Sequence, residues 1–255
     1  MPNPLDYPLP FFLLCLLLLW LAARLGARFR RRRGEPDEAE KENLSLIVSA
    51  ALTLLALIIG FSFSMAVGRY DQRKNYEEEE ANAIGTEYVR VGLLPAADAA
   101  KVRALLKSYL DERMVFYTTR NAGRLAQANA ATAQLQTELW SAVEAPAAAQ
   151  PTPLSALAVS GMNDVLNSQG YAQAAWWNRI PLAAWFLMGA IAICCNWLAG
   201  YGARIPKTKP QRNFILPLIV AIAFFLIADL DSPRGGVIRV HPQNLMSLSS
   251  SMTAP

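Results

Sequence analysis

The sequence predicts an all-α membrane protein with four transmembrane helices and a helical extramembrane domain between the second and the third. Of its 255 residues, 53% are hydrophobic and only 17% are charged, whereas about a quarter of the residues in an average soluble domain are charged. Four apolar runs approach or exceed the roughly 20 residues that an α-helix needs to cross a hydrocarbon core. The stretch between the second and third runs has helical spacing of apolar residues and no strand pattern of any length.

The first apolar run, 7–23, precedes a basic block that ends at Arg33. A secretory signal peptide carries its positive charge before the apolar core, so we expect a retained helix here. The second run, from Leu44 to Gly68, holds no charged residue and continues through 69–92 with almost no helix breaker. The sequence therefore predicts one long helix that crosses the bilayer and projects beyond it.

The two later runs are also expected to span the membrane. Trp176, Trp177 and Trp185 stand near the start of the third, as in an interfacial aromatic belt, and Pro217 lies near the start of the fourth. The expected division of the chain is transmembrane helix 1 at 7–28, a charged loop at 29–43, transmembrane helix 2 at 44–68, the extramembrane helical domain at 69–178, transmembrane helix 3 at 180–203, a basic loop at 204–212, transmembrane helix 4 at 213–230 and a C-terminal tail at 231–255.

The extramembrane domain reads as a helical bundle. One helix is expected to begin after Pro95, and a second covers 121–144 and ends at Pro146. After a linker at 147–154, a third covers 155–178. The face of the first helix is formed by residues that recur with helical spacing: Val102, Leu105, Leu106, Tyr109, Arg113 and Phe116.

Several function classes are disfavoured by composition. His241 is the only histidine, and the three cysteines all lie in apolar runs, so we expect no metal site, no cofactor and no enzyme activity. Basic residues gather beside apolar runs instead of alternating with aromatic ones, which argues against nucleic-acid binding. Four successive glutamates, 77–80, spread around a helical turn and are interpreted as a solvated face.

Lysines and arginines in short loops mark the cytoplasmic side of a membrane protein. They are concentrated in the loops at 29–43 and 204–212. This rule places both loops in the cytoplasm, with the helical domain and both termini outside.

Two rows of residues on transmembrane helix 2 have spacing that could carry function. The first changes from small hydroxyl side chains to bulky apolar ones at steps of four: Ser45, Ser49, Thr53, Leu57 and Phe61. In a symmetric oligomer, such a row could form a wettable vestibule and a hydrophobic constriction. The second is a ridge of small residues that lets helix backbones approach closely: Ala56, Gly60, Ser64 and Gly68. Alternatively, both rows are ordinary contacts within one four-helix bundle.

Arg69 and Arg73 lie one turn apart at the end of the uncharged segment. They could form a cationic collar that attracts anions to a pore mouth. Alternatively, they snorkel at the interface or pair with neighbouring carboxylates, such as Asp71 and Glu77. After the fourth span, Asp229 and Asp231 precede a Pro-Arg-Gly-Gly sequence, where two carboxylates are too few for a calcium loop and a tight turn bonded to Arg234 is the simpler interpretation.

Three blocks in order resemble the bestrophin-like membrane family, a group of mostly bacterial proteins. The first runs from Gly60-Phe61 to Gly68-Arg69-Tyr70, the second is Glu80-Ala-Asn82-Ala-Ile-Gly85, and the third is Asp229-Leu-Asp231-Ser-Pro233-Arg-Gly235-Gly236. The resemblance extends from Leu44 to Val240. A more distant similarity connects the second helix to the neck helix of true bestrophins, which are pentameric anion channels.

The resemblance implies a passive anion channel in which Phe61, Leu57 and Thr53 form the neck. This is the same row that the spacing selects, although Thr53 is polar. The expected partners are the lipid bilayer, further copies of the chain (five if the family pattern holds) and small anions. The expected location is the inner membrane, which the chain crosses several times.

Two features depart from the bestrophin pattern. The dense acidic cluster with which animal bestrophins bind calcium is not matched by Asp229 and Asp231. Bestrophins also hold their helical domain in the cytosol, opposite to the side that the loop arginines indicate, and we give the charge rule more weight. The competing function is a non-channel sensor or scaffold, a dimer whose helical domain binds a partner.

Overall fold

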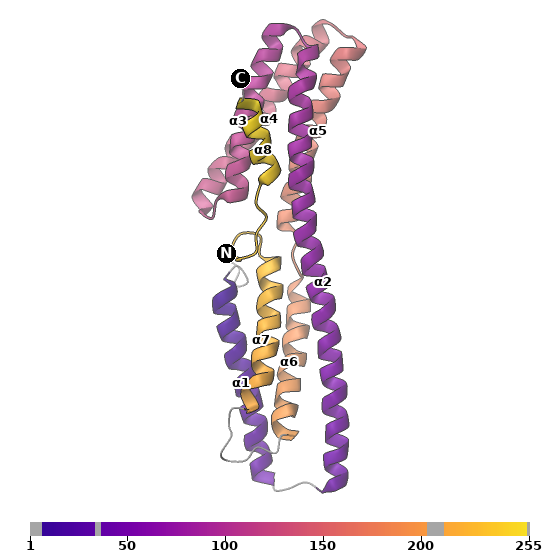
Figure 1. Ribbon diagram of the computed structural model, residues 1–255, viewed down its shortest axis with the longest axis vertical. Helices are drawn as coiled ribbons and strands as arrows, with labels where there is room; N and C mark the ends of the chain where they lie inside the picture. Colours follow the sequence, from indigo (N-terminus) through magenta and orange to yellow (C-terminus); the bar gives the residue numbers. More distant parts are fainter. Residues whose placement is uncertain (1–6, 34–36, 203–211, 254–255) are drawn as a thin grey trace. The chain divides into compact units, whose positions relative to one another are not determined.

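The computed structural model describes residues 7–33, 37–202 and 212–253, and all of their regular structure is helical (Figure 1). The helices are α1 (Pro8–Arg33), α2 (Glu38–Arg90), the short 3₁₀ helix η2 (Val91–Leu93), α3 (Ala96–Thr118), α4 (Ala122–Ala149), α5 (Pro153–Trp177), α6 (Leu182–Gly202), α7 (Arg212–Asp231) and α8 (Gln243–Thr253). Four stretches contain helices long and apolar enough to cross a membrane: Pro8–Arg32, Glu38–Leu93, Pro153–Gly202 and Phe214–Asp231. The predicted fold class is confirmed.

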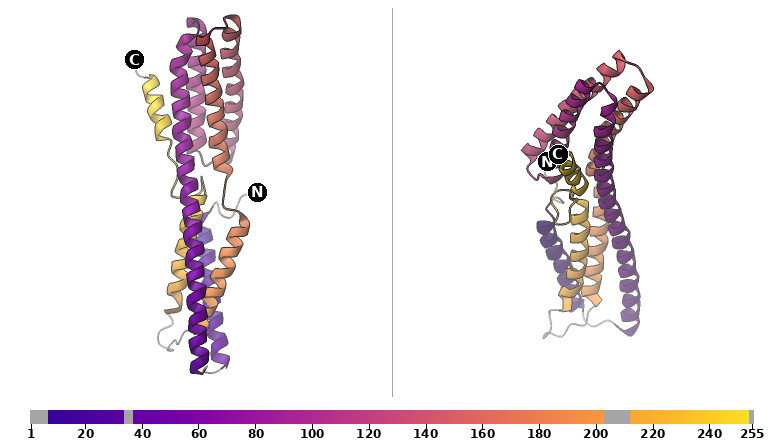
Figure 2. Two further views of the ribbon diagram at one scale, coloured as in Figure 1. Left: turned by 90° about the vertical axis from the view of Figure 1, so that its right-hand side faces the viewer. Right: turned by 45° about the horizontal axis from the view of Figure 1, so that its top comes forward.

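The chain divides into two compact units, which are described separately. The first consists of the residues up to Arg69 together with Arg179–Ile238, and the second of Tyr70–Asn178 together with Arg239–Pro255. Helix α2 is continuous through the boundary, so the half that holds its apolar run belongs to the first unit and its charged half, from Tyr70, belongs to the second (Figure 2). The C-terminal residues therefore belong with the extramembrane domain, to which the sequence did not assign them.

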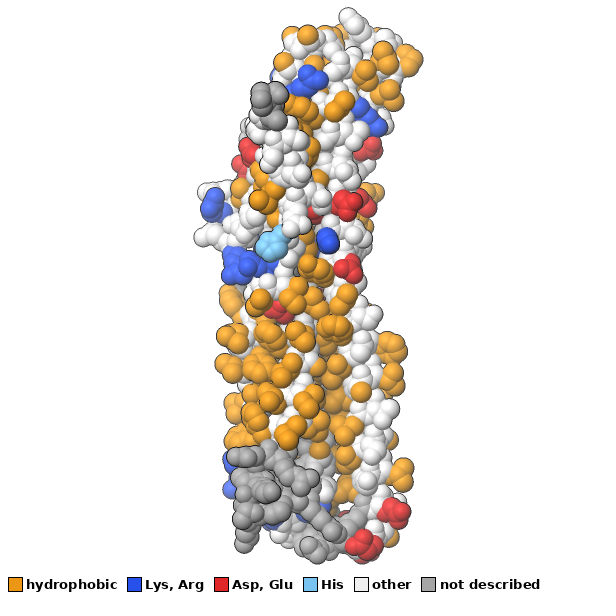
Figure 3. Space-filling model, in the orientation of Figure 1, with side chains coloured by type: hydrophobic (Ala, Val, Ile, Leu, Met, Phe, Trp, Pro, Cys, Tyr) orange, Lys and Arg blue, Asp and Glu red, His pale blue; other side chains and the backbone are white. Residues whose placement is uncertain are grey.

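The first unit is built around α1, which packs against α6 and α7. Two glycines allow the close approach of α1 and α6: a Cβ atom at Gly26 would lie 2.1 Å from the carbonyl oxygen of Trp197, and one at Gly200 would lie 2.0 Å from that of Ala23. Small residues serve the same purpose at many membrane helix interfaces. Hydrophobic side chains cover the outer surface of α1 and α7 (Figure 3), as expected of a surface that faces lipid.

The second unit has its own hydrophobic core between the charged half of α2 and helices α3, α4, α5 and α8. Its fully buried side chains include Leu106, Tyr109, Phe116, Met162 and Leu245. Helix α5 begins with a capping box, in which the side chains of Thr152 and Ser155 each accept a hydrogen bond from the other's backbone N–H. Helix α4 begins at the side chain of Asn121, which accepts a hydrogen bond from the Arg124 N–H at 3.0 Å.

Three expectations about local structure were wrong. Helix α1 extends to Arg33 and α2 begins at Glu38, so much of the expected loop at 29–43 is helical. Helix α4 continues through Pro146 to Ala149. The expected C-terminal tail contains α8, whose Leu245 is buried in the core of the second unit. In α8, tertiary burial of an apolar face orders a segment whose many serines gave little helical signal.

Candidate functional site

The candidate site is α2. One face of this helix is buried along both units, at spacings of three, four and seven: Leu55, Ser62, Ala66, Arg73, Glu77, Glu80, Ile84 and Glu87. The opposite face is exposed. In the most apolar window of α2 only 6% of residues are buried within the chain, compared with 22%, 28% and 50% for the other three spans. The protein's own helices therefore leave most of this span uncovered.

The three residues of the predicted neck lie on the exposed face. Phe61 is 67% exposed and Leu57 is 52% exposed, and Thr53 is exposed as well. The Thr53 hydroxyl donates a hydrogen bond to the Ser49 carbonyl oxygen at 2.9 Å, the local bond that membrane helices often provide for threonine. The helix thus presents the three side chains outward in one row, and within the described chain they are not core contacts.

The predicted small-residue ridge is also open. Ala56, Gly60, Ser64 and Gly68 are exposed, and a Cβ atom at Gly60 or Gly68 would have no heavy atom within 4 Å outside its own helix. The close approach between helices of the first unit uses Gly26 and Gly200 instead. The structure thus leaves the ridge available to a partner outside the chain.

The two arginines of the predicted collar are both engaged within the chain. Arg69, with 18% of its side chain exposed, pairs with Asp231 at 3.4 Å. Arg73 is only 2% exposed, and its Nε donates a hydrogen bond to the Ala175 carbonyl oxygen at 3.3 Å. Arg69 thus pairs with a carboxylate, although this acidic partner comes from the far end of the fourth span and not from a neighbouring residue of α2.

The two aspartates that follow the fourth span hold backbone amides. Asp231 accepts hydrogen bonds from the Ile180 N–H at 3.0 and 3.1 Å, and Asp229 accepts from the N–H groups of Val237 at 2.7 Å and Ile238 at 2.8 Å. Gly236 is required beside them, because a Cβ atom there would lie 2.6 Å from the Asp229 carbonyl oxygen. This motif therefore closes the turn after α7 and ties it to the start of α6 and to Arg69.

The turn also contains two further residues of this motif, Pro233 and Gly235. The Gly235 N–H donates a hydrogen bond to the Ser232 hydroxyl at 3.2 Å. Across the described ranges of the chain, no group of three or more His, Cys, Asp or Glu side chains could hold a metal ion.

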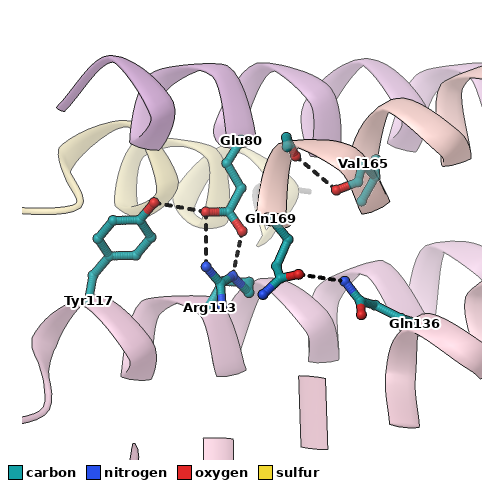
Figure 4. A network of polar contacts seen from close by, with 7 residues as sticks. Glu80, Arg113, Tyr117, Gln136, Val165 and Gln169 are labelled. Atoms are coloured by element: carbon teal, nitrogen blue, oxygen red, sulfur yellow. Dashed lines mark hydrogen bonds and ion pairs between the residues drawn. The ribbon is translucent and has the colours of Figure 1, made fainter. Parts of the chain in front are cut away.

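The middle motif contributes the buried ionic centre of the second unit (Figure 4). The carboxylate of Glu80 accepts hydrogen bonds from Arg113 through Nε and through Nη2, the latter at 3.3 Å, and from the Tyr117 hydroxyl at 2.9 Å. Both charged side chains are fully buried. The guanidinium of Arg113 also lies 4.2 Å from the Phe116 ring centroid, within range of a cation–π interaction.

Burial and charge shift the pKa values in this centre. Burial lowers the pKa of Arg113, but the Glu80 carboxylate outweighs burial, so the pKa is raised and the arginine remains charged. Burial, reinforced by Glu80, raises the pKa of the Tyr117 hydroxyl, which therefore stays protonated as a hydrogen-bond donor. The Arg113 guanidinium and the Tyr117 hydroxyl therefore both present hydrogen-bond donors to the Glu80 carboxylate.

The remaining motif residues have separate places on α2. Tyr70 packs against the hydrophobic core, and Asn82 is exposed. A Cβ atom at Gly85 would lie 3.0 Å from the Leu248 side chain of α8. Position 85 is therefore a point of close contact with the C-terminal helix.

The interpretation of the four glutamates as a solvated face was wrong for Glu77 and Glu80, which are buried. Glu77 accepts hydrogen bonds from the Leu245 N–H at 3.0 Å and from the Asn244 side chain at 2.7 Å, so it caps the first turn of α8. The sequence did carry one signal for the buried pair of Glu80 and Arg113. Arg113 falls at an apolar position of its helix and therefore needs a buried counter-charge.

Comparisons with known proteins agree with this architecture. The chain matches the Bestrophin-like domain over residues 10–245. It resembles solved structures of a bacterial bestrophin homologue from Klebsiella pneumoniae. A tryptophan-to-alanine mutant has a TM-score of 0.66 at 14% identity and covers 98% of this chain and 100% of that one. A tyrosine-to-alanine mutant has a TM-score of 0.63 at 13% identity and covers 94% and 99%.

A further structure of the homologue, phased with zinc, has a TM-score of 0.60 at 14% identity and covers 95% and 98%. At these identities the similarity shows a shared fold and nothing finer. No curated protein matched the chain. The domain match covers nearly the whole chain, as the three sequence blocks predicted, and this protein belongs to the Bestrophin-like family.

Proposed function

We propose that this protein is a passive anion channel of the inner membrane, formed by several copies of the chain with α2 lining the pore. The observation that carries the proposal is the exposed face of α2. A span with only 6% of its apolar window buried needs covering by lipid or by other copies of the chain. Its exposed hydroxyls favour water over hydrocarbon, which in turn favours a position around a central axis.

The order of side chains along the exposed face supports a constriction. Thr53 would contribute a wettable ring, Leu57 an apolar ring and Phe61 the bulkiest ring. A narrow apolar segment can prevent ion flow by excluding water. The neck would therefore be tightest at Phe61 and wider toward Thr53.

In this proposal Arg69 and Arg73 do not form a cationic collar that faces the solution. Arg69 fixes the end of the span to the turn after α7 through Asp231, and Arg73 holds α2 against the last turn of α5. They would stabilise the pore helix from its buried side. The preference for anions therefore rests on the family resemblance, and the experiment must measure ion selectivity directly.

Ion flux from liposomes that contain the purified protein tests the proposal, with chloride and sodium measured separately. Phe61→Ala should increase the flux, because it removes the bulkiest ring of the neck. Phe63→Ala is the matched control: this phenylalanine is also exposed on α2, 41% against 67% for Phe61, but lies two residues away on a different face of the helix. Native mass spectrometry should show a ring, with five copies if the bestrophin pattern holds.

Absence of flux from both the wild type and Phe61→Ala, each shown to be folded and inserted, would refute the channel proposal. A dimer joined through the open ridge at Gly60 and Gly68 would then support the sensor or scaffold. Equal increases from Phe61→Ala and Phe63→Ala would instead mean that the exposed row is not the neck.

A further inference from the structure

Glu87 is a buried acid without a counter-charge bonded to it. It lies in the charged half of α2, well beyond the membrane-spanning segment at 44–68, and it is 0% exposed. Among the described residues, neither of its carboxylate oxygens has a hydrogen-bond partner. An isolated buried carboxylate is strongly disfavoured as an ion, so this group is expected to hold a proton.

The space around the carboxyl is provided by a glycine of α5. A Cβ atom at Gly161 would lie 2.0 Å from Oε2 of Glu87 and 2.9 Å from Nη1 of Arg90. The carboxyl group thus occupies the volume that a side chain at position 161 would fill. The carboxyl oxygen lies so close to the α5 backbone that no side chain separates the two, and a proton on the carboxyl itself can neutralise the buried acid there.

Two charged groups act on the carboxyl, one from each helix of this contact. Arg90 follows Glu87 by three residues on α2, and its Nη1 lies 3.7 Å from Oδ2 of Asp164 on α5. Burial raises the pKa of Glu87 most, Arg90 lowers it and Asp164 raises it, for a net pKa of about 8. On the α3 side, Arg103 donates a hydrogen bond to the Tyr88 carbonyl oxygen at 3.2 Å.

We propose that Glu87, Arg90 and Asp164 form a proton-operated switch at the contact between α2 and α5. While Glu87 holds its proton, the guanidinium of Arg90 pairs with Asp164 at the surface. When Glu87 releases the proton to water, the new buried carboxylate draws Arg90 inward and Asp164 loses its partner. The switch does not depend on ion conduction, so it stands or falls independently of the proposed function.

The direction of the pH effect follows from the raised pKa. The folded state keeps a proton at Glu87 that the unfolded chain releases above the ordinary pKa of 4.5. The stabilisation by neutral Glu87 is therefore fully present below pH 4.5. It declines as the pH rises and is lost above about pH 8, where the folded protein also releases the proton.

Infrared difference spectroscopy of the full-length protein in detergent tests the switch. The spectrum of wild type minus Glu87→Gln at pH 6 should contain the carbonyl band of a protonated carboxylic acid, and this band should disappear with a midpoint near pH 8. Glu79→Gln, an exposed neighbour on the same helix, is the control and should leave the band intact. The amide of Glu87→Gln has the shape of the protonated acid, so this variant should fold.

Two further variants keep Glu87 and test its coupling to the other two groups. Arg90→Gln should raise the pH midpoint of the Glu87 band by ~1 pH unit, because it removes the cation that stabilises the Glu87 carboxylate. Asp164→Asn should lower the midpoint by ~1 pH unit, because it removes a nearby negative charge and leaves Arg90 without its competing partner. Absence of the band at pH 6 from the spectrum of wild type minus Glu87→Gln would overturn the proposal. A midpoint that neither Arg90→Gln nor Asp164→Asn moves would show an isolated buried acid and would overturn the switch.

Discussion

The buried pair of Glu80 and Arg113 provides the sharpest test of how the second unit is stabilised. Glu80→Gln keeps the shape of the side chain but removes its charge, which leaves Arg113 charged and fully buried. Removing one partner of a buried ion pair typically costs about 3–5 kcal/mol. The Tyr117 hydroxyl would also lose its charged acceptor, so we expect a value in the upper part of this range.

The assay is thermal unfolding of the purified full-length protein, followed by tryptophan fluorescence. In proteins of comparable length, 1 kcal/mol corresponds to about 2–4 °C in Tm, so Glu80→Gln should lower the transition of the second unit by ~10 °C. Glu79→Gln is the matched control, because Glu79 is the exposed adjacent residue and surface substitutions usually stay within ~0.5 kcal/mol.

A double variant separates the charge effect from loss of packing. Glu80→Leu combined with Arg113→Met removes both charges and keeps apolar volume, and such replacements of buried pairs are often neutral or stabilising. The double variant should therefore be more stable than Glu80→Gln alone. Equal stability of Glu80→Gln and Glu79→Gln would refute the argument that this pair is buried and coupled.

Two further substitutions test the other contacts described above. Gly200→Val should separate α1 from α6 and reduce the yield of folded protein, because even its Cβ atom would lie 2.0 Å from the Ala23 carbonyl oxygen. The control is Gly189→Val on the same helix, where a Cβ atom has no heavy atom within 4 Å. In a detergent-stability assay, Gly189→Val should be as stable as the wild type. Glu77→Ala should release α8, because the Leu245 N–H loses its acceptor. Limited proteolysis should then cleave the C-terminal helix faster than in the wild type. An unchanged cleavage rate would contradict the capping role.

The residues that sequence analysis located most reliably are those whose environment is set by the membrane. A segment of about 20 apolar residues has few alternatives to a spanning helix. The hydrocarbon core offers its backbone N–H and C=O groups no water, so they must form hydrogen bonds with each other, as they do in a helix. Composition alone therefore predicts a span at 44–68, and the absence of breakers through 69–92 predicted the single long helix α2. The three motif blocks predicted the family that the domain match shows.

Charged residues outside the membrane were harder to place, because their environment depends on partners distant in the chain. Arg69 and Asp231 are separated by 162 positions and Glu77 and Leu245 by 168. The spread of 77–80 around one helical turn suggested a solvated face, yet Glu77 and Glu80 are buried on the face of α2 that also carries Glu87. A glutamate next to another glutamate has no local feature that reveals which of the two is buried.

The sequence by itself determined the number of candidate spans, the continuation of α2 beyond its apolar run and the family, and it selected Thr53, Leu57 and Phe61 as a row on one face of that helix. Hydropathy and helical periodicity suffice for these features because they depend on the solvent and on near neighbours. Only the tertiary structure decided that the neck row is exposed, that both arginines are held within the chain and that three glutamates of α2 are buried. These outcomes depend on which helix covers which face of α2, and burial then determines whether a charge attracts ions, forms a pair or holds a proton.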